Sequence, residues 1–302
     1  MSEDTLEKTL TVSSPARLKL SNICGSVEIR PGEDGEIQVT AVKRPHSGDA
    51  QRTEIEMSQE ADGRVTVATH FPEGAWAWLF GSRPCCVDYT VRAPRHCSLT
   101  LNGVSSTLEA EGFAGEFSVN SVSGVVALRD LTGDLHLHTV SGEVSGERLS
   151  GALDLDAVSG DVELAASSLP AVHAKTISAN VSLQTSLGTG PYTFNSVSGE
   201  VRLMLPPDAR CTAELYSVSG DLTTVFPVSS YSHTVGSQIV ALQGGGVSLS
   251  MHSVSGDLSL DCEGGLPAAE AQGLSAAERR ELLERIERGE LTVDEALARL
   301  RS

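Results

Sequence analysis

The chain has 302 residues, an aromatic content of 4% and a formal net charge of −18. Such an acidic composition excludes the basic stripe that nucleic-acid binding requires and disfavours docking on anionic lipid. The first residues show no secretory signal, and no run of about 18 apolar residues could span a membrane, so we expect a cytoplasmic protein without a membrane span.

Six cysteines are spread along the chain without a CxxC pair: Cys24, Cys85, Cys86, Cys97, Cys211 and Cys262. In a chain expected to stay in the reducing cytoplasm, free thiols are the favoured interpretation. The alternative is a disulfide or a metal site that joins Cys85 or Cys86 to Cys97.

Residues 1–103 predict strands without a regular repeat. Apolar and polar residues alternate around Leu18, Val27, Val65 and Val91, which is typical of strands with one buried face. Repeat arrays need atypical end units that cover the exposed edge of the first coil. We therefore expect this segment to form an irregular β N-terminal part that caps the repeat region.

Both tryptophans of the chain lie in one aromatic segment, residues 71–80, which Gly and Pro interrupt. Such a segment either anchors a partner or plugs the open end of the array, and we favour the plug. As candidates for partner binding it contributes Trp76, Trp78 and Phe80.

The tripeptide Val-Ser-Gly dominates residues 104–260. It starts at Val122, Val140, Val158, Val197, Val218 and Val254, and degenerate copies start at Val104, Ile177 and Val235. A period of 17 to 21 residues indicates stacked copies of one supersecondary unit. We predict nine such coils, which at the strand spacing of about 4.8 Å would span roughly 40 Å.

Each unit divides into two modules of nine residues, in which apolar residues alternate with polar ones after a glycine. In the first of these, Val122, Val126 and Leu128 are expected to share one buried face with Gly124. The pattern predicts an all-β fold, a parallel β-solenoid with about 18 residues per coil. An antiparallel meander is the rival, but Asn-Gly and Asp-Gly turns do not occur at the module boundaries.

Stacking would align acidic residues that follow each glycine into a column: Val125, Glu143, Asp161, Asn180, Glu200, Asp221 and Asp257. Carboxylates about 4.8 Å apart repel by roughly 1 kcal/mol, so a divalent cation on Glu143, Asp161, Glu200 and Asp221 is conceivable. We favour a solvated acidic ridge that discourages edge association.

A second set of polar residues precedes each repeated valine and includes His136, His138, Asp154, Asp156 and His173. These five are weak candidates for a transition-metal site, because imidazole and carboxylate suit such ions. Cross-strand charge pairing is the favoured interpretation, and we assign no cofactor and no catalytic residue.

The C-terminal part changes from strand to helix periodicity. Residues 261–274 are rich in Gly, Ala and Pro and predict a linker, and residues 275–302 predict a helical hairpin with a capping box at each helix start. Its apolar face, which would bind a partner, a second copy or the last coil, consists of Leu283, Ile286, Leu297 and Leu300.

Residues 8–260 resemble the bacterial putative-adhesin family of β-strand-repeat domains of unknown function. The resemblance rests on the sequence LKLSNICGSV of residues 18–27 and on the repeated Ser-Val-Ser-Gly-Asp/Glu units. Residues 282–296 are similar to the SHOCT-like helical segment of some members. The resemblance implies a right-handed β-solenoid and a link to bacterial envelope stress, and it implies no catalytic residues.

We expect a non-enzymatic scaffold or protein-interaction protein that binds a protein partner or itself. The alternative is a carbohydrate- or surface-binding module, which would need exposed aromatic platforms. A β-helical polysaccharide-acting enzyme is a remote alternative, because acid/base catalysis needs a cleft with a perturbed carboxylate pair rather than a uniform ridge.

Overall fold

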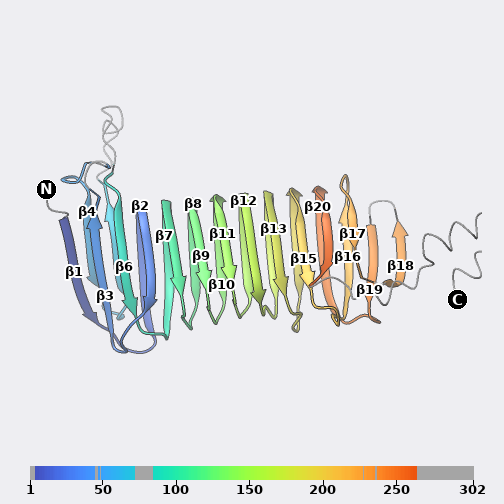
Figure 1. The fold of residues 1–302 in the computed structure, drawn as a ribbon, viewed down its shortest axis with the longest axis horizontal. Helices are drawn as coiled ribbons and strands as arrows, with labels where there is room; N and C mark the ends of the chain where they lie inside the picture. Colours follow the sequence, from blue (N-terminus) through green and yellow to red (C-terminus); the bar gives the residue numbers. More distant parts are fainter. Residues whose placement is uncertain are drawn as a thin grey trace, which may run out of the picture. The chain divides into compact units, whose positions relative to one another are not determined.

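The computed structural model describes residues 4–44, 47, 49–71, 84–226, 228–234 and 237–263. In this part of the chain, 21 β-strands join through hydrogen bonds into one continuous sheet system, which confirms the predicted β-solenoid (Figure 1). None of these residues belongs to a helix long and apolar enough to cross a membrane. The predicted helical hairpin, residues 275–302, lies outside the described residues, as does all of the predicted linker beyond Glu263.

Each coil contributes one strand segment to each of two parallel sheets. In spatial order, the first sheet holds β5 (Val65–His70), the first half of β2 (Ala16–Pro31), the first half of β7 (Cys97–Glu111), β8 (Phe117–Ser123), β10 (Leu135–Ser141), the first halves of β12 (Leu153–Ser167) and β13 (Val172–Thr185), β14 (Tyr192–Ser198), β20 (Val247–Ser255) and β16 (Cys211–Ser217).

The second sheet stacks the other half of each coil. In spatial order it holds β6 (Val87–Ala93), the second halves of β2 and β7, β9 (Val125–Arg129), β11 (Glu143–Glu147), the second halves of β12 and β13, β15 (Val201–Leu205), β21 (Leu258–Cys262) and β17 (Leu222–Thr224). Isolated parallel bridges from His96 through Ala114, Thr132 and Ser150 to Ser168 add a short third side.

Antiparallel strands extend both ends of the stack. At the N-terminal end, β4 (Glu54–Gln59) pairs with β5, while β3 (Glu36–Lys43) pairs with β6 and with β1 (Asp4–Thr11). At the other end, β19 (Ser237–Leu242) pairs with β16 and with β18 (Val228–Thr234). The irregular N-terminal part therefore combines antiparallel end strands with β2, which is itself a complete parallel coil.

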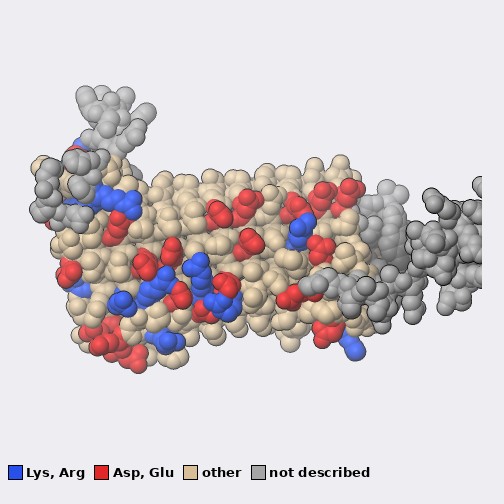
Figure 2. Space-filling view, viewed as in Figure 1, with Lys and Arg blue, Asp and Glu red and all other residues tan. Residues whose placement is uncertain are grey.

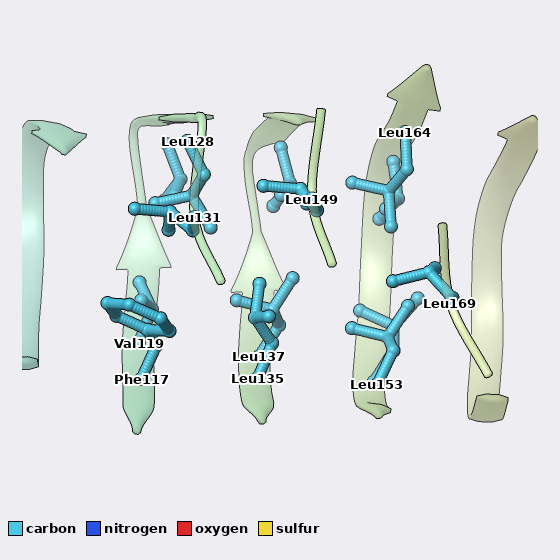
Figure 3. Close-up of a cluster of buried hydrophobic side chains, with 14 of the residues drawn as sticks. Phe117, Val119, Leu128, Leu131, Leu135, Leu137, Leu149, Leu153, Leu164 and Leu169 are labelled. Atoms are coloured by element: carbon cyan, nitrogen blue, oxygen red, sulfur yellow. The ribbon is translucent and has the colours of Figure 1, made fainter. Parts of the chain in front are cut away.

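The core consists of aliphatic rungs that repeat from coil to coil. Leu99, Phe117, Leu135 and Leu153 are successive partners in the first sheet, and their numbers differ by 18. On the third side, Leu131, Leu149 and Leu169 are almost completely buried and point into the same interior (Figure 3). Every coil thus closes a small apolar cross-section, which explains how a chain with so few aromatic residues can form a core.

The repeated valine does not belong to this core, which corrects our expectation. Val122 is 48% exposed, whereas Val126 and Leu128 are buried. Gly124, between Val122 and Val126, has a φ of +125°. A Cβ added to this glycine would lie 2.2 Å from the carbonyl oxygen of Ser106 in the preceding coil. The chain bends at this glycine, so the alternation of side chains does not continue through it.

Coils do not stack in the order of the sequence, contrary to the prediction of nine successive coils. The last coil, β20–β21, pairs on one side with β14–β15 and on the other with β16–β17 (Figure 1). The presumed repeat copy at Val235 lies outside the described residues, and the strands that flank it in the sequence, β18 and β19, pair antiparallel. A similar exchange occurs at the other end, where β2 lies between β5–β6 and β7.

A disulfide joins Cys24 of β2 to Cys86, which precedes β6, so two of the six predicted free thiols are paired. Cys97, which the alternative prediction joined to Cys85 or Cys86, is a free and buried thiol. Neither cysteine of the pair could be matched from the sequence, because β2 and β6 become neighbours only through the exchanged order of the first coils.

Candidate functional site

A row of aliphatic side chains follows the bend between the two sheets from coil to coil. We call it the aliphatic ladder, and in spatial order it comprises Ile23, Val104, Val122, Val140, Val158, Ile177, Val197, Val254 and Val218. Ile23 and Val158 are half-buried, and the other seven are between 36% and 64% exposed. An apolar row of this length marks an interaction site more often than a neutral surface.

The N-terminal end of the aliphatic ladder borders a shallow apolar groove of about 280 Å³. Ile23, Val104, Val122 and Val140 line it together with Asn102 and other residues of the first sheet. Asn102 accepts a hydrogen bond at Oδ1 from Nδ2 of Asn120 at 3.0 Å and donates one to Ser21 Oγ at 3.1 Å. The amide side chains therefore fix one wall of the groove.

An acidic column runs beside the aliphatic ladder on the second sheet, at the position after each glycine. In spatial order it reads Val125, Glu143, Asp161, Asn180, Glu200, Asp257 and Asp221. Asn180 Nδ2 donates to Asp161 Oδ1 at 2.9 Å, and Asn180 Oδ1 accepts from the backbone N–H of Glu200 at 3.1 Å. This asparagine separates carboxylates, and binding of a divalent cation there stays a prediction.

A polar column flanks the aliphatic ladder on the first sheet, two residues before each aliphatic position. It reads Asn102, Asn120, His138, Asp156, Lys175, Asn195, His252 and Tyr216 in spatial order. His233, which the sequence placed in this column, belongs instead to the antiparallel strand β18. The aliphatic ladder thus has an acidic border on one side and a largely neutral to basic border on the other.

The weak metal candidates lie on the first sheet in adjacent rungs, as their register predicts. His136 Nδ1 lies 3.7 Å from Asp154 Oδ2, while His173 Nδ1 lies 2.5 Å from Thr193 Oγ1. His138 and Asp156 face each other in the polar column. Within the described ranges, no three His, Cys, Asp or Glu side chains come together in a way that could hold a metal ion.

A hollow of about 840 Å³ lies near the N-terminal end of the second sheet. Among its charged lining residues, Arg30 contacts Glu28 at 3.0 Å and also Glu111, and Asp130 is bound by Arg148 at 2.6 Å. Arg92 and Arg95 line the same hollow. On the face shown in Figure 2, most Lys and Arg side chains gather toward this end, while acidic side chains continue along the stack.

Buried thiols are poor nucleophiles in this fold. Burial raises the pKa of Cys97 to about 12 and the pKa of Cys211 to about 11. A thiol with such a pKa carries almost no thiolate at neutral pH. The remaining candidates for partner binding, Trp76, Trp78, Phe80, Leu283, Ile286, Leu297 and Leu300, lie outside the described residues.

The aliphatic ladder is the feature that sequence reasoning missed, although its residues are those of the repeat itself. Two features of the sequence could have revealed it. In every complete copy, the glycine two positions after the valine permits a bend, and the residue between them is a polar serine. A residue next to such a bend need not follow the strand alternation.

Comparison with protein families gives one match, to the model described as Toastrack DUF4097, over residues 16–261. This range covers most of the chain and includes all the coils that carry the aliphatic ladder. Among curated proteins, none matches the chain.

Several solved structures are similar at 10% sequence identity. A putative cell adhesion protein from Clostridium sporogenes covers 86% of this chain and 100% of its own, with a TM-score of 0.28. Putative adhesins from Bacteroides fragilis and Parabacteroides merdae cover 87% and 86% of this chain and 98% and 96% of their own, with TM-scores of 0.38 and 0.36. At this level of similarity they support no inference about activity.

Proposed function

The chain belongs to the Toastrack DUF4097 family, and from this premise we propose that it is a non-enzymatic interaction module whose β-solenoid presents one long face to a protein. The link to bacterial envelope stress, which the family resemblance implies, is the setting we propose for that interaction. The module would act by holding a partner against a preformed surface rather than by chemistry.

The aliphatic ladder is the observation that carries this proposal. Seven of its nine side chains expose more than a third of their surface, up to 64% at Val218, on a stack whose core rungs are closed. Leaving aliphatic side chains in water forfeits the free energy of their burial, about 1.5 to 3 kcal/mol for a fully buried valine. A partner that covers the ladder would recover part of this free energy.

Carbohydrate binding has less support. Sugar-binding surfaces use exposed aromatic rings, and Tyr216, at 40%, is the large aromatic side chain that the described surface exposes. It lies in the polar column, where its ring is 5.9 Å from that of His252, rather than on an aromatic platform.

Site-specific photo-crosslinking tests the proposal. A photoreactive amino acid would replace Val122 or Val197 on the aliphatic ladder, and Leu6 on β1 as a control of similar exposure. In cells that express the full chain, we expect both ladder positions to crosslink to the same protein and Leu6 to crosslink to none. Equal crosslinking from all three positions, or none from the ladder, would contradict the proposal.

A further inference from the structure

The repeat of the aliphatic ladder limits which surfaces can follow it from end to end. Its nine rungs are stacked strands, about 4.8 Å apart. An α-helix laid along the ladder presents one side chain per turn of about 5.4 Å, so it drifts by about one rung over the eight intervals. A surface with the same strand spacing stays in register over the whole ladder, and a second copy of this chain has that spacing.

The two borders of the aliphatic ladder decide how a second copy could face it. Two copies related by a two-fold axis can run antiparallel or parallel along the ladder. The antiparallel arrangement sets acidic column against acidic column, so that about the central rung Asp161 meets Asp161 and Glu143 meets Asn180. No side chain of the polar column then faces a carboxylate of the acidic column. In the parallel arrangement, each acidic column faces the polar column of the other copy.

In the parallel arrangement, the imidazole and ammonium groups of the polar column lie along the acidic column of the other copy. Coils at the same level would bring Glu143 opposite His138, and Asp257 opposite His252. Lys175 would face the column that carries Asp161 and Glu200 on either side of Asn180. All of these side chains are exposed. The rung of Val158 is the exception to this charge pattern, because it places Asp161 opposite Asp156, whose side chain is half-buried. Complementary borders of this kind fix the register and orientation of an interface.

We propose that the aliphatic ladder is a self-association face on which two copies of this chain pack in parallel, with the two-fold axis along the stack. This inference rests on the proposed function, because it uses the same face and names its partner. The net charge of −18 on each copy is compatible with such contact because salt screens it beyond about 8 Å, whereas the border pairs act at close range.

The oligomeric state of the full chain is the first test. Sedimentation velocity at physiological salt should show a dimer, and the double variant Val122→Ser/Val140→Ser should weaken dimerisation by at least about 100-fold, because four apolar side chains per dimer are lost. Leu6→Ser, which removes an equally exposed side chain from β1, should leave dimerisation unchanged. A monomer, or equal weakening by Leu6→Ser, would overturn the inference.

Disulfide trapping tests the orientation. In the parallel arrangement each rung faces itself, so Val122→Cys and Val197→Cys should each form a crosslinked dimer alone under mild oxidation. The antiparallel arrangement brings Val122 of one copy opposite Val197 of the other, because both lie two rungs from the central rung, Val158. Only a mixture of the two variants would then crosslink. Crosslinking of the mixture alone would overturn the parallel arrangement.

These outcomes separate the inference from the proposed function. If the chain is a monomer and the photoreactive group at Val122 still captures another protein, self-association is wrong and the interaction face remains. If neither a second copy nor another protein is captured from the ladder, both are wrong.

Discussion

At the scale of single residues, Asp88 holds the first two coils together beside the disulfide of Cys24 and Cys86. Its Oδ1 accepts hydrogen bonds from the backbone N–H of Ser26 at 2.8 Å and from Ser26 Oγ at 2.6 Å, and Arg44 binds both of its oxygens. Burial disfavours the charged form of Asp88, but the hydrogen bonds from Arg44 and Ser26 outweigh it, so the pKa of Asp88 lies below its ordinary value of 3.8.

Because the folded protein lowers this pKa, the carboxylate stabilises the fold above pH 4, and that contribution disappears as the pH falls through the lowered pKa. We predict that Asp88→Asn lowers the free energy of unfolding by about 1 to 2 kcal/mol at pH 7. At pH 3 and below, the difference from the parent chain should shrink. Urea unfolding at both pH values measures it, with the exposed Glu7→Gln as a control; an equal loss at both would contradict the assignment.

At the scale of the strand and its bend, glycine decides where side chains point. Most complete Val-Ser-Gly copies end a strand of the first sheet, whereas the copy at Val158 lies within β12. At Gly124 the backbone passes close to the carbonyl of Ser106 in the neighbouring coil. The serines beside the ladder bond between coils in turn, since Ser123 Oγ donates to the carbonyl oxygen of Val104 at 3.0 Å. The tripeptide is therefore a stacking unit as well as a turn.

Gly124→Ala should destabilise the stack strongly, because a Cβ meets backbone at 2.2 Å and the φ of +125° disfavours any side chain. We expect a loss above about 3 kcal/mol from combined backbone strain and steric overlap. Gly35→Ala is the matched control, since Gly35 has a φ of +87° but open space around its Cβ position. It should cost about 1 kcal/mol. Equal shifts of the thermal midpoint for both variants would show that the close approach is unimportant.

At the scale of the whole solenoid, each end of the described stack exchanges the order of two coils. The last coil in the sequence, β20–β21, is an interior coil in space, while β16–β17 lies outside it and is covered by β19 on the first sheet. The segment that joins β17 to β20, residues 225–246, makes this exchange and includes the antiparallel pair β18–β19. The last described strand, β21, thereby lies between β15 and β17 instead of forming an edge that could recruit other chains.

Hydrogen exchange should reveal this order. In a stack that follows the sequence, the last coil would fray first. Here β21 pairs with both β15 and β17, so we expect its amides, from Leu258 to Cys262, to exchange more slowly than those of β17, from Leu222 to Thr224. Mass spectrometry of peptides from the two strands measures the difference. Faster exchange in β21 would contradict the exchanged order.

By itself the sequence determined the fold class and most of the register. The apolar alternation returns after 18 residues, and stacked parallel strands pair residues that are 18 apart. It also aligned the acidic column from Val125 to Glu200 and the neighbours His136 and Asp154, since both follow from that step, but not the order of Asp257 and Asp221. A positive φ at Gly124, Gly142, Gly160 and Gly199 bends the chain beside the repeated valine, and alternation cannot express such a bend. The position of β20–β21 and the pairing of Cys24 with Cys86 depend on which coils become neighbours. Because all coils offer nearly the same pattern of apolar residues and hydrogen-bonding groups, only the tertiary structure decided that choice.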